Sequence, residues 1–295
     1  MRIGLSAYDI GAADFAALAE AADEAGFDSI WLGEHVVRPV SYTSEHPSAA
    51  SPTTQHHQGP VVAEGTLLID PFVTLAAASV RTTRIMLATG IYLLPLRHPI
   101  AVARSIATLQ DLAKGRFTLG VGAGWLAEEF RALGVEFGDR WSLFNEHLEV
   151  VRLLLTGQEA QFSGRHVEFD AVRLDTGRVD VPIVLGGNSP AALRRASRYG
   201  DGWLSSGTPT LSEAKVLRAD LDRACASIGR PRELLQWYRA RFEDAADLDG
   251  YEASDFQRVV LWADQLWPRH GDLPAKREHF DARLRETGLH ERLLA

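Results

Sequence analysis

Short apolar runs alternate with longer amphipathic runs along most of this sequence, and this alternation restricts the fold more than any other feature. The first pair is an expected strand over 1–7 and an expected helix over 14–25, which Gly26 closes as a C-terminal cap. Strands that alternate with helices predict a parallel sheet, because parallel neighbours need a crossover connection. The number of such pairs predicts an α/β fold of the TIM (β/α)8 barrel type, formed by a single domain over 1–295.

The other expected elements continue this rhythm. Further strands are expected at 27–33, 84–90, 116–122, 182–185, 202–205, 234–242 and 256–262, and further helices at 71–80, 99–113, 126–133, 142–155, 190–199 and 211–228. The alternation in 161–174, with Ser163-Gly164 as its turn, predicts a hairpin within an insertion of about 157–180. Only 243–255 separates the last two strands, which predicts a truncated or irregular crossover in the last quarter of the chain.

One expected strand has a face that is nearly bare of side chains. In KGRFTLGVGAGW, residues 114–125, apolar residues alternate with Thr118, Gly120 and Gly122. Glycine inside a strand costs entropy and packs nothing, so it marks a point where another backbone or a ligand comes close. We interpret Gly120, Gly122 and Gly124 as space kept free at the end of a barrel strand, with a bulge or tight turn as the alternative.

Five expected strands end in small or polar residues, at the barrel end where active sites lie. These ends are Gly33-Glu34-His35, Ala88-Thr89-Gly90, Gly122-Ala123-Gly124-Trp125, Gly186-Gly187-Asn188-Ser189 and Ser205-Ser206-Gly207. Together they predict a broad cavity with hydrogen-bond donors, and turn-rich strand ends without a site are the alternative.

The fourth of these ends runs directly into a helix whose first turn contains Pro190. Exposed amides at a helix N-terminus bind anions, and glycines let an anion come close to them. Gly186, Gly187 and Asn188 therefore predict a binding site for the phosphate of a cofactor.

Two titratable residues at the end of the second strand are the catalytic candidates. His35 can act near pH 7 as an acid, a base or a hydrogen-bond donor, although a structural histidine is the alternative. Glu34 is expected to orient the imidazole or a neighbouring strand.

A long connection over 34–69 follows the second strand and shows no periodicity, which is typical of a lid or binding loop. A surface loop without function is the alternative. Its histidines, His46, His56 and His57, lack a metal-ligand spacing with carboxylates or cysteines. We expect no metal.

Composition excludes several classes of protein. The net charge of −8 and the scattered lysines and arginines argue against a nucleic-acid partner. The sequence lacks a run of ~18 apolar residues, so no membrane span is expected. The N-terminus reads as a first strand and not as a signal peptide. The lone Cys225 permits no internal disulfide and fits a cytoplasmic location.

Several segments together resemble one known family. They are WLGEH at 31–35, DPFVTLAAAS at 70–79, LATGIYLLPLRHP at 87–99, ATLQDLAKGRFTLGVGAGW at 107–125, EF at 129–130 and GGNSPAALRRASRYGDGW at 186–203. The pattern resembles the bacterial luciferase-like monooxygenases over roughly residues 1–230. The GVGxGW strand end and the EHVVRPVSYTSEHP loop are similar to the branch that uses the deazaflavin coenzyme F420, while FMN-dependent relatives share the barrel.

The resemblance implies a reduced flavin or deazaflavin at the strand ends. His35 matches a histidine near the reactive ring, and Thr89, Gly90 and Ile91 match a bulge against the ring face, commonly with a non-proline cis peptide. The other implied cofactor-binding residues are Gly122, Gly124, Trp125, Arg140, Gly186, Gly187 and Asn188, in which the two adjacent glycines match the phosphate-binding pair and Arg140 a residue that reaches the phosphate. The tail from Arg232 onward departs from the family pattern.

Three functions are therefore considered. The first is an oxidoreductase that transfers hydride between F420 and a small organic substrate. The second is a monooxygenase that uses reduced FMN from a partner reductase, and the third is a non-catalytic flavin-binding barrel. A homodimer is expected. The candidate pocket walls are Trp31, Phe72, Tyr42 and Trp125, each of which could equally belong to the core.

Overall fold

Eight parallel strands form a closed barrel in the computed structural model, which describes residues 1–47, 61–230 and 233–294. The barrel strands are β1 (Arg2–Ala7), β2 (Ser29–Leu32), β3 (Met86–Thr89), β5 (Phe117–Gly122), β8 (Ile183–Gly186), β9 (Gly202–Leu204), β10 (Leu235–Arg239) and β11 (Arg258–Trp262). The ring closes where β1 pairs with β11 and where β3 pairs with β5. The TIM-barrel prediction is confirmed.

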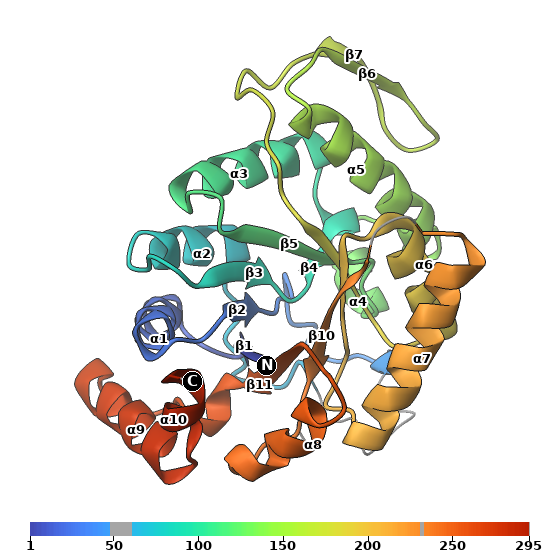
Figure 1. The fold of residues 1–295 in the computed structure, drawn as a ribbon. Coiled ribbons are helices and arrows are strands. Elements are labelled where there is room, and N and C mark those ends of the chain that lie inside the picture. The colour runs from blue at the N-terminus through green and yellow to red at the C-terminus, as the bar shows by residue number, and fades with distance from the viewer. Residues whose placement is uncertain (48–60, 231–232, 295) are drawn as a thin grey trace.

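Most helices surround the barrel in Figure 1, whereas the short helix α4 (Ala127–Ala132) lies within the ring of strands in this view. The helices are α1 (Ala12–Ala25), α2 (Pro71–Ser79), α3 (Pro99–Leu112), α4, α5 (Arg140–Leu155), α6 (Pro190–Tyr199), α7 (Leu211–Ser227), α8 (Asp249–Glu252), α9 (Leu273–Glu286) and α10 (Leu289–Leu294). Gly26 ends α1 in the left-handed conformation, as the sequence predicts. Thr210 and Glu213 form a reciprocal capping box at the start of α7.

Side chains alternate between two apolar clusters because successive strand residues point to opposite faces. On β2, Ile30 and Leu32 belong to the main core, whereas Trp31 belongs to a smaller cluster with side chains from five other barrel strands. This second cluster fills the barrel interior. Trp31 is fully buried in it, and the partly buried Phe72 packs against Tyr92 and Phe117. The sequence left pocket wall and core open for both residues, and the structure places both in the core.

The hairpin lies outside the barrel sheet. Strands β6 (Ala160–Ser163) and β7 (Glu168–Val172) pair antiparallel and project beyond α5 in Figure 1. The predicted turn at Ser163-Gly164 is wrong, because Ser163 pairs with Glu168 and the loop covers 164–167. Glu146 on α5 causes this longer loop by accepting hydrogen bonds from the amides of 165–167.

The last quarter of the chain is more regular than its sequence suggests. The crossover between β10 and β11 is short, as predicted, with a 3-10 turn (Ala245–Leu248) and the four-residue α8. The sequence analysis missed α9 and α10. Helix α9 packs beside α1, where Phe280 contacts Phe27 and Lys276 pairs with Asp14 at 2.9 Å.

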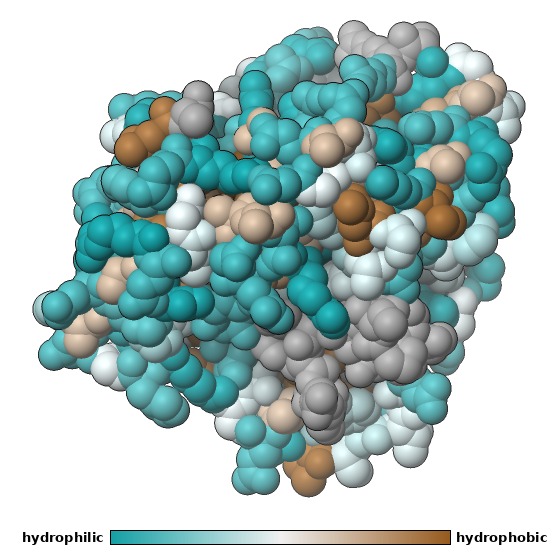
Figure 2. Space-filling model, turned by 60° about the horizontal axis from the view of Figure 1, so that its bottom comes forward, coloured by the Kyte–Doolittle hydropathy of each residue, from teal (hydrophilic) through white to brown (hydrophobic). Residues whose placement is uncertain are grey.

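The outer surface drawn in Figure 2 is mostly hydrophilic, and its hydrophobic residues occur in small separate groups. Within the described segments, no helix is both long enough and apolar enough to cross a membrane.

Candidate active site

A cavity of about 1470 Å³ opens at the carboxyl ends of the barrel strands. Its wall also includes segments 38–42, 44–47 and 61–64 of the long connection after β2, as expected for a binding loop. Ten of the predicted site residues line it: Glu34, His35, Gly90, Ile91, Gly122, Gly124, Trp125, Gly186, Gly187 and Asn188. Thr89 and Arg140 are not among the lining residues. Of the candidate pocket walls, Tyr42 and Trp125 line the cavity.

The floor of the cavity is the irregular end of β3. The Gly90–Ile91 peptide bond is cis, as the family resemblance implies, and the chain then forms the short strand β4 (Tyr92–Leu93) beside β5. A Cβ on Gly120 would lie 1.9 Å from the Thr89 carbonyl oxygen, and one on Gly122 would lie 2.0 Å from Ile91 Cδ1. The bare face of β5 is therefore the space that receives the end of β3.

Thr89 lies beneath this floor. Its side chain is fully buried and donates a hydrogen bond of 2.7 Å to the carbonyl oxygen of Gly120. It can support the position of Gly90 and Ile91, but it does not reach the cavity.

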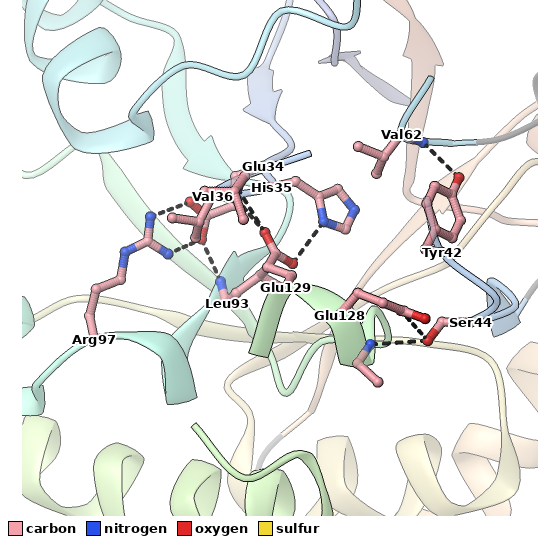
Figure 3. Close-up of polar contacts among 12 residues, drawn as sticks. Glu34, His35, Val36, Tyr42, Ser44, Val62, Leu93, Arg97, Glu128 and Glu129 are labelled. Carbon is pink, nitrogen blue, oxygen red and sulfur yellow. Dashed lines mark hydrogen bonds and ion pairs between the residues drawn. The ribbon is translucent and has the colours of Figure 1, made fainter. Parts of the chain in front are cut away.

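The imidazole of His35 is held by a carboxylate from α4. Nδ1 of His35 lies 3.0 Å from Oε2 of Glu129, and both side chains are buried. The other Glu129 oxygen accepts hydrogen bonds from the backbone amides of Val36 and Val37, as Figure 3 shows in part. Because the carboxylate occupies Nδ1, Nε2 is the ring nitrogen that can exchange a proton with a ligand.

Glu34 has a different partner. Its carboxylate accepts two hydrogen bonds from Arg97, at 2.7 and 2.8 Å, and one from the amide of Leu93 at 2.6 Å (Figure 3). Burial raises the pKa of Glu34, and the Arg97 guanidinium opposes that rise. Of the two roles expected for Glu34, it therefore orients a neighbouring strand, β4. The expectation that it orients the imidazole is wrong, because Glu129 does so.

The loop side of the cavity is aromatic. Trp125 contacts His35, Tyr42 and His46 edge to face, with ring centroids 5.5, 6.0 and 5.1 Å away. Burial is the main cause that lowers the pKa of His46 to about 4, so this ring is neutral at pH 7. Within the described segments, no group of three His, Cys, Asp or Glu residues could hold a metal, and the expected lid residues His56 and His57 lie outside those segments.

The start of α6 offers backbone donors to an anion. Gly187 has a φ of 110°, and a Cβ there would lie 3.0 Å from Cβ of Ala192. Ser189 caps the helix by accepting from the amide of Ala192 at 3.2 Å. The Asn188 side chain exchanges two hydrogen bonds of 2.8 Å with the backbone of Ser206, which fixes the two loops together. Among the described residues, the amides of Asn188 and Ser189 have no acceptor, so they can bind a phosphate.

Arg140 lies on α5, outside the cavity wall. Its guanidinium stacks on Phe137 at 3.9 Å and donates to the Phe137 carbonyl, while its buried Nε has no partner among the described residues. Sequence reasoning missed two neighbours, Trp141, which lines the cavity, and Arg195, which stacks on Trp141 at 3.4 Å. Arg195 lies on α6, the helix whose start the sequence analysis assigned to phosphate binding. Its position in the second turn of this helix could have identified it as a further candidate.

A buried arginine at the floor was also missed. Arg239 ends β10, lines the cavity, and donates to the carbonyl oxygens of Ser205 and Gly90 at 2.8 and 3.0 Å. Burial lowers its pKa to about 10. The signal was an arginine among apolar residues within the expected strand 234–242, in the part of the sequence that departs from the family pattern.

The fold and the cavity define a class of protein: a TIM barrel with a cavity of the size of a small-molecule site at the carboxyl ends of its strands. Residues 2–243 match the profile of the luciferase-like monooxygenase family. The chain therefore belongs to the luciferase-like monooxygenase family.

Two curated relatives show how this chain stands within the family. An uncharacterized protein of Mycobacterium tuberculosis is 33% identical over 225 residues, which are 74% of this chain and 76% of the relative. An F420-dependent glucose-6-phosphate dehydrogenase of Beutenbergia cavernae is 33% identical over 211 residues, 69% of this chain and 56% of that protein. The second relative supports the resemblance to the F420-dependent branch.

Solved structures share the fold at low sequence identity. An F420-dependent secondary alcohol dehydrogenase in complex with an F420–acetone adduct has a TM-score of 0.64 at 21% identity, covering 97% of this chain and 84% of that one. The FMN-bound oxygenating constituent of 3,6-diketocamphane monooxygenase from Pseudomonas putida also has a TM-score of 0.64, at 18% identity and with 98% and 79% coverage. The Beutenbergia cavernae dehydrogenase and both solved structures are named for F420 or FMN, so a general deazaflavin or flavin oxidoreductase activity is supported.

Proposed function

We propose that this protein transfers hydride between coenzyme F420 and a small organic substrate. The observation that carries the proposal is the 33% identity to an F420-dependent dehydrogenase, together with a histidine held by a buried glutamate at the mouth of the cavity. The FMN-dependent neighbour is similar only in fold, at 18% identity.

The residues present fit a phosphorylated ring cofactor. Glycines 122, 186 and 187 leave the cavity wall free of side chains, and the open amides of Asn188 and Ser189 suit its phosphate. The buried hydroxyl of Tyr8 lines the cavity and has no hydrogen-bond partner among the described residues. An unpartnered polar atom at a cavity wall indicates that a ligand completes the site.

Each part of the site then has a task. A bound deazaflavin supplies or accepts the hydride. The start of α6 binds the phosphate, and the Gly90–Ile91 floor orients the ring. The loop residues Tyr42 and His46 pack on Trp125 and exclude water from that side. Nε2 of His35 holds a proton for the oxygen of the substrate, while Glu129 keeps the imidazole in place.

Equilibrium binding of F420 and of FMN to the purified protein, each in both redox states, tests this function. Tighter binding of F420 is expected. Tighter binding of reduced FMN would contradict it and favour the second function, a monooxygenase that takes reduced FMN from a reductase. The single domain, the homodimer and the cytoplasmic location remain predictions from the sequence.

A further inference from the structure

A positive charge is buried at the floor of the cavity. Arg239 is 7% exposed, and its guanidinium donates to Ser205 O at 2.8 Å, Gly90 O at 3.0 Å and Ser6 Oγ at 3.2 Å. These partners are two carbonyls and a hydroxyl, all uncharged. In the described part of the chain, no carboxylate lies within ion-pair distance of Arg239. A buried charge without a counter-charge is costly, and proteins keep one mainly where a ligand completes it.

The two buried carboxylates near the floor are already engaged. Glu34 forms its bidentate pair with Arg97, and Glu129 binds His35. Two other titratable side chains of the cavity wall are neutral at pH 7, because burial lowers the pKa of His46 to about 4 and raises that of Tyr8. The cavity wall also contains the carboxylates of Glu45, Glu64 and Glu213. The positive charge of Arg239 is itself one of the causes that lower the pKa of His46.

The remaining contacts of Arg239, among the residues that the structure describes, are uncharged as well. The Trp262 ring of β11 lies 4.9 Å from the guanidinium, and the backbone amide of Arg239 donates to the Ser205 hydroxyl of the β9 end. Burial lowers the pKa of Arg239 to about 10. The negative charge must come from what the cavity binds.

The floor connects this arginine to the phosphate end of the site. The Ile91 side chain packs against Gly122 and Gly186, and Gly186 leads to the open amides at the start of α6. On the other side of the same peptide, the Gly90 carbonyl accepts from Arg239. A ligand that is anchored at α6 and lies flat on Ile91 therefore reaches Arg239 with one edge of its ring.

We propose that Arg239 is the counter-cation of the pyrimidinedione edge of the cofactor ring and favours the form of the ring that has lost a proton there. The inference rests on the proposed function. Flavins and deazaflavins share this edge, whose ring N–H can release its proton to water and leave a charge spread over nitrogen and carbonyl oxygen. A fixed guanidinium in a low-dielectric floor stabilises that charge more strongly than water-exposed charges do.

The test is a pH titration of the absorbance spectrum of the reduced cofactor bound to the protein under anaerobic conditions, with F420 and FMN as separate arms. In the parent protein, the bound ring is expected to lose its proton at a lower pH than the free ring. In Arg239→Met the ionisation constant should fall about tenfold or more, whereas Arg239→Lys, which keeps the charge, should stay near the parent value. Arg241→Met is the matched control, because Arg241 lies two residues on and is exposed.

Three outcomes overturn the proposal. One is an equal ionisation constant in the parent and Arg239→Met; another is a bound ring that ionises at the same pH as the free ring or at a higher pH, which requires only the parent protein. The third is the absence of binding of either cofactor to the parent, which also overturns the proposed function. If the cofactor binds but its ring ionises at the same pH as the free ring, only the role of Arg239 is overturned, and the proposed function stands. If Arg239→Met does not fold, the titrations of the parent and of Arg239→Lys, each compared with the free ring, still test the proposal.

Discussion

Glu129 fixes one nitrogen of His35, and the other nitrogen is therefore free to serve the substrate. His35→Ala should lower turnover by about 10²–10⁴-fold, because a positioned acid or base typically contributes that factor. Cofactor binding should change far less, since the phosphate contacts lie at α6. Steady-state kinetics and cofactor titration measure both quantities, with the exposed His98→Ala as control. Near-normal turnover in His35→Ala would remove this residue from the mechanism.

Two adjacent glutamates on α4 offer a matched comparison of burial. Glu129 is fully buried and binds His35 and two backbone amides, whereas Glu128 lies at the surface. Glu129→Ala should reduce the free energy of unfolding by about 1.5–3 kcal/mol, because it leaves buried donors unsatisfied. Glu128→Ala should cost less than about 1 kcal/mol. Urea denaturation of both variants measures the difference, and equal losses would contradict the role given to Glu129.

At the scale of elements, the turn between β8 and α6 carries the phosphate prediction. Gly187→Val should weaken cofactor binding and leave the fold intact, because its Cβ would meet Ala192 and its φ of 110° disfavours side chains. Gly177→Val is the control, since Gly177 also has a positive φ but open space around it. Isothermal titration compares the two variants. A Gly187→Val protein that binds the cofactor as tightly as the parent would show that the phosphate lies elsewhere.

The loop after β2 also contacts α4 through Glu128, a partly exposed carboxylate. Hydrogen bonds from the Thr43 amide and the Ser44 hydroxyl lower the pKa of Glu128 from 4.5 to about 2. A depressed pKa stabilises the folded contact above the unfolded value, so this contribution is complete above pH 4.5 and disappears as the pH falls toward 2. Figure 3 shows the contact between Ser44 and Glu128.

Hydrogen exchange of the Thr43 amide should therefore accelerate, relative to the protein's other protected amides, as the pH is lowered from 4.5 toward 2. Glu128→Gln should show the faster exchange already at neutral pH. If its Thr43 amide exchanged at the parent rate, another contact would hold this loop.

At the scale of the whole molecule, the C-terminal helices complete the barrel. Phe280 on α9 is fully buried and contacts the rings of Phe27 and Trp267. Phe280→Ala should lower the free energy of unfolding by about 3–5 kcal/mol, the usual cost of removing a buried phenyl ring. The exposed neighbour His279→Ala should have little effect. Chemical denaturation followed by tryptophan fluorescence measures both, and similar stabilities would mean that α9 adds little to the barrel.

The sequence by itself determined the elements and the end of the barrel that carries the site. Periods of 2 and 3.6 are local properties of the chain, so the strands and most helices could be read directly. The glycines of β5 and of the β8 end also predicted that another group comes close to the backbone there. In the structure, the Thr89 carbonyl lies against Gly120, and the Ile91 side chain lies against Gly122. The family resemblance added the cis bond at Gly90–Ile91.

Only the tertiary structure decided which charges meet. Glu34 is adjacent to His35 in sequence but pairs with Arg97, while the imidazole binds Glu129, 94 residues away. Both residues lie beyond the end of β2, where their side chains contact different elements: Glu34 contacts β4, and His35 contacts α4. Arg239 meets Ser6 across 233 residues because β1 and β10 both flank β11 in the closed ring. No local period encodes such a contact, since it depends on the register at which the barrel closes.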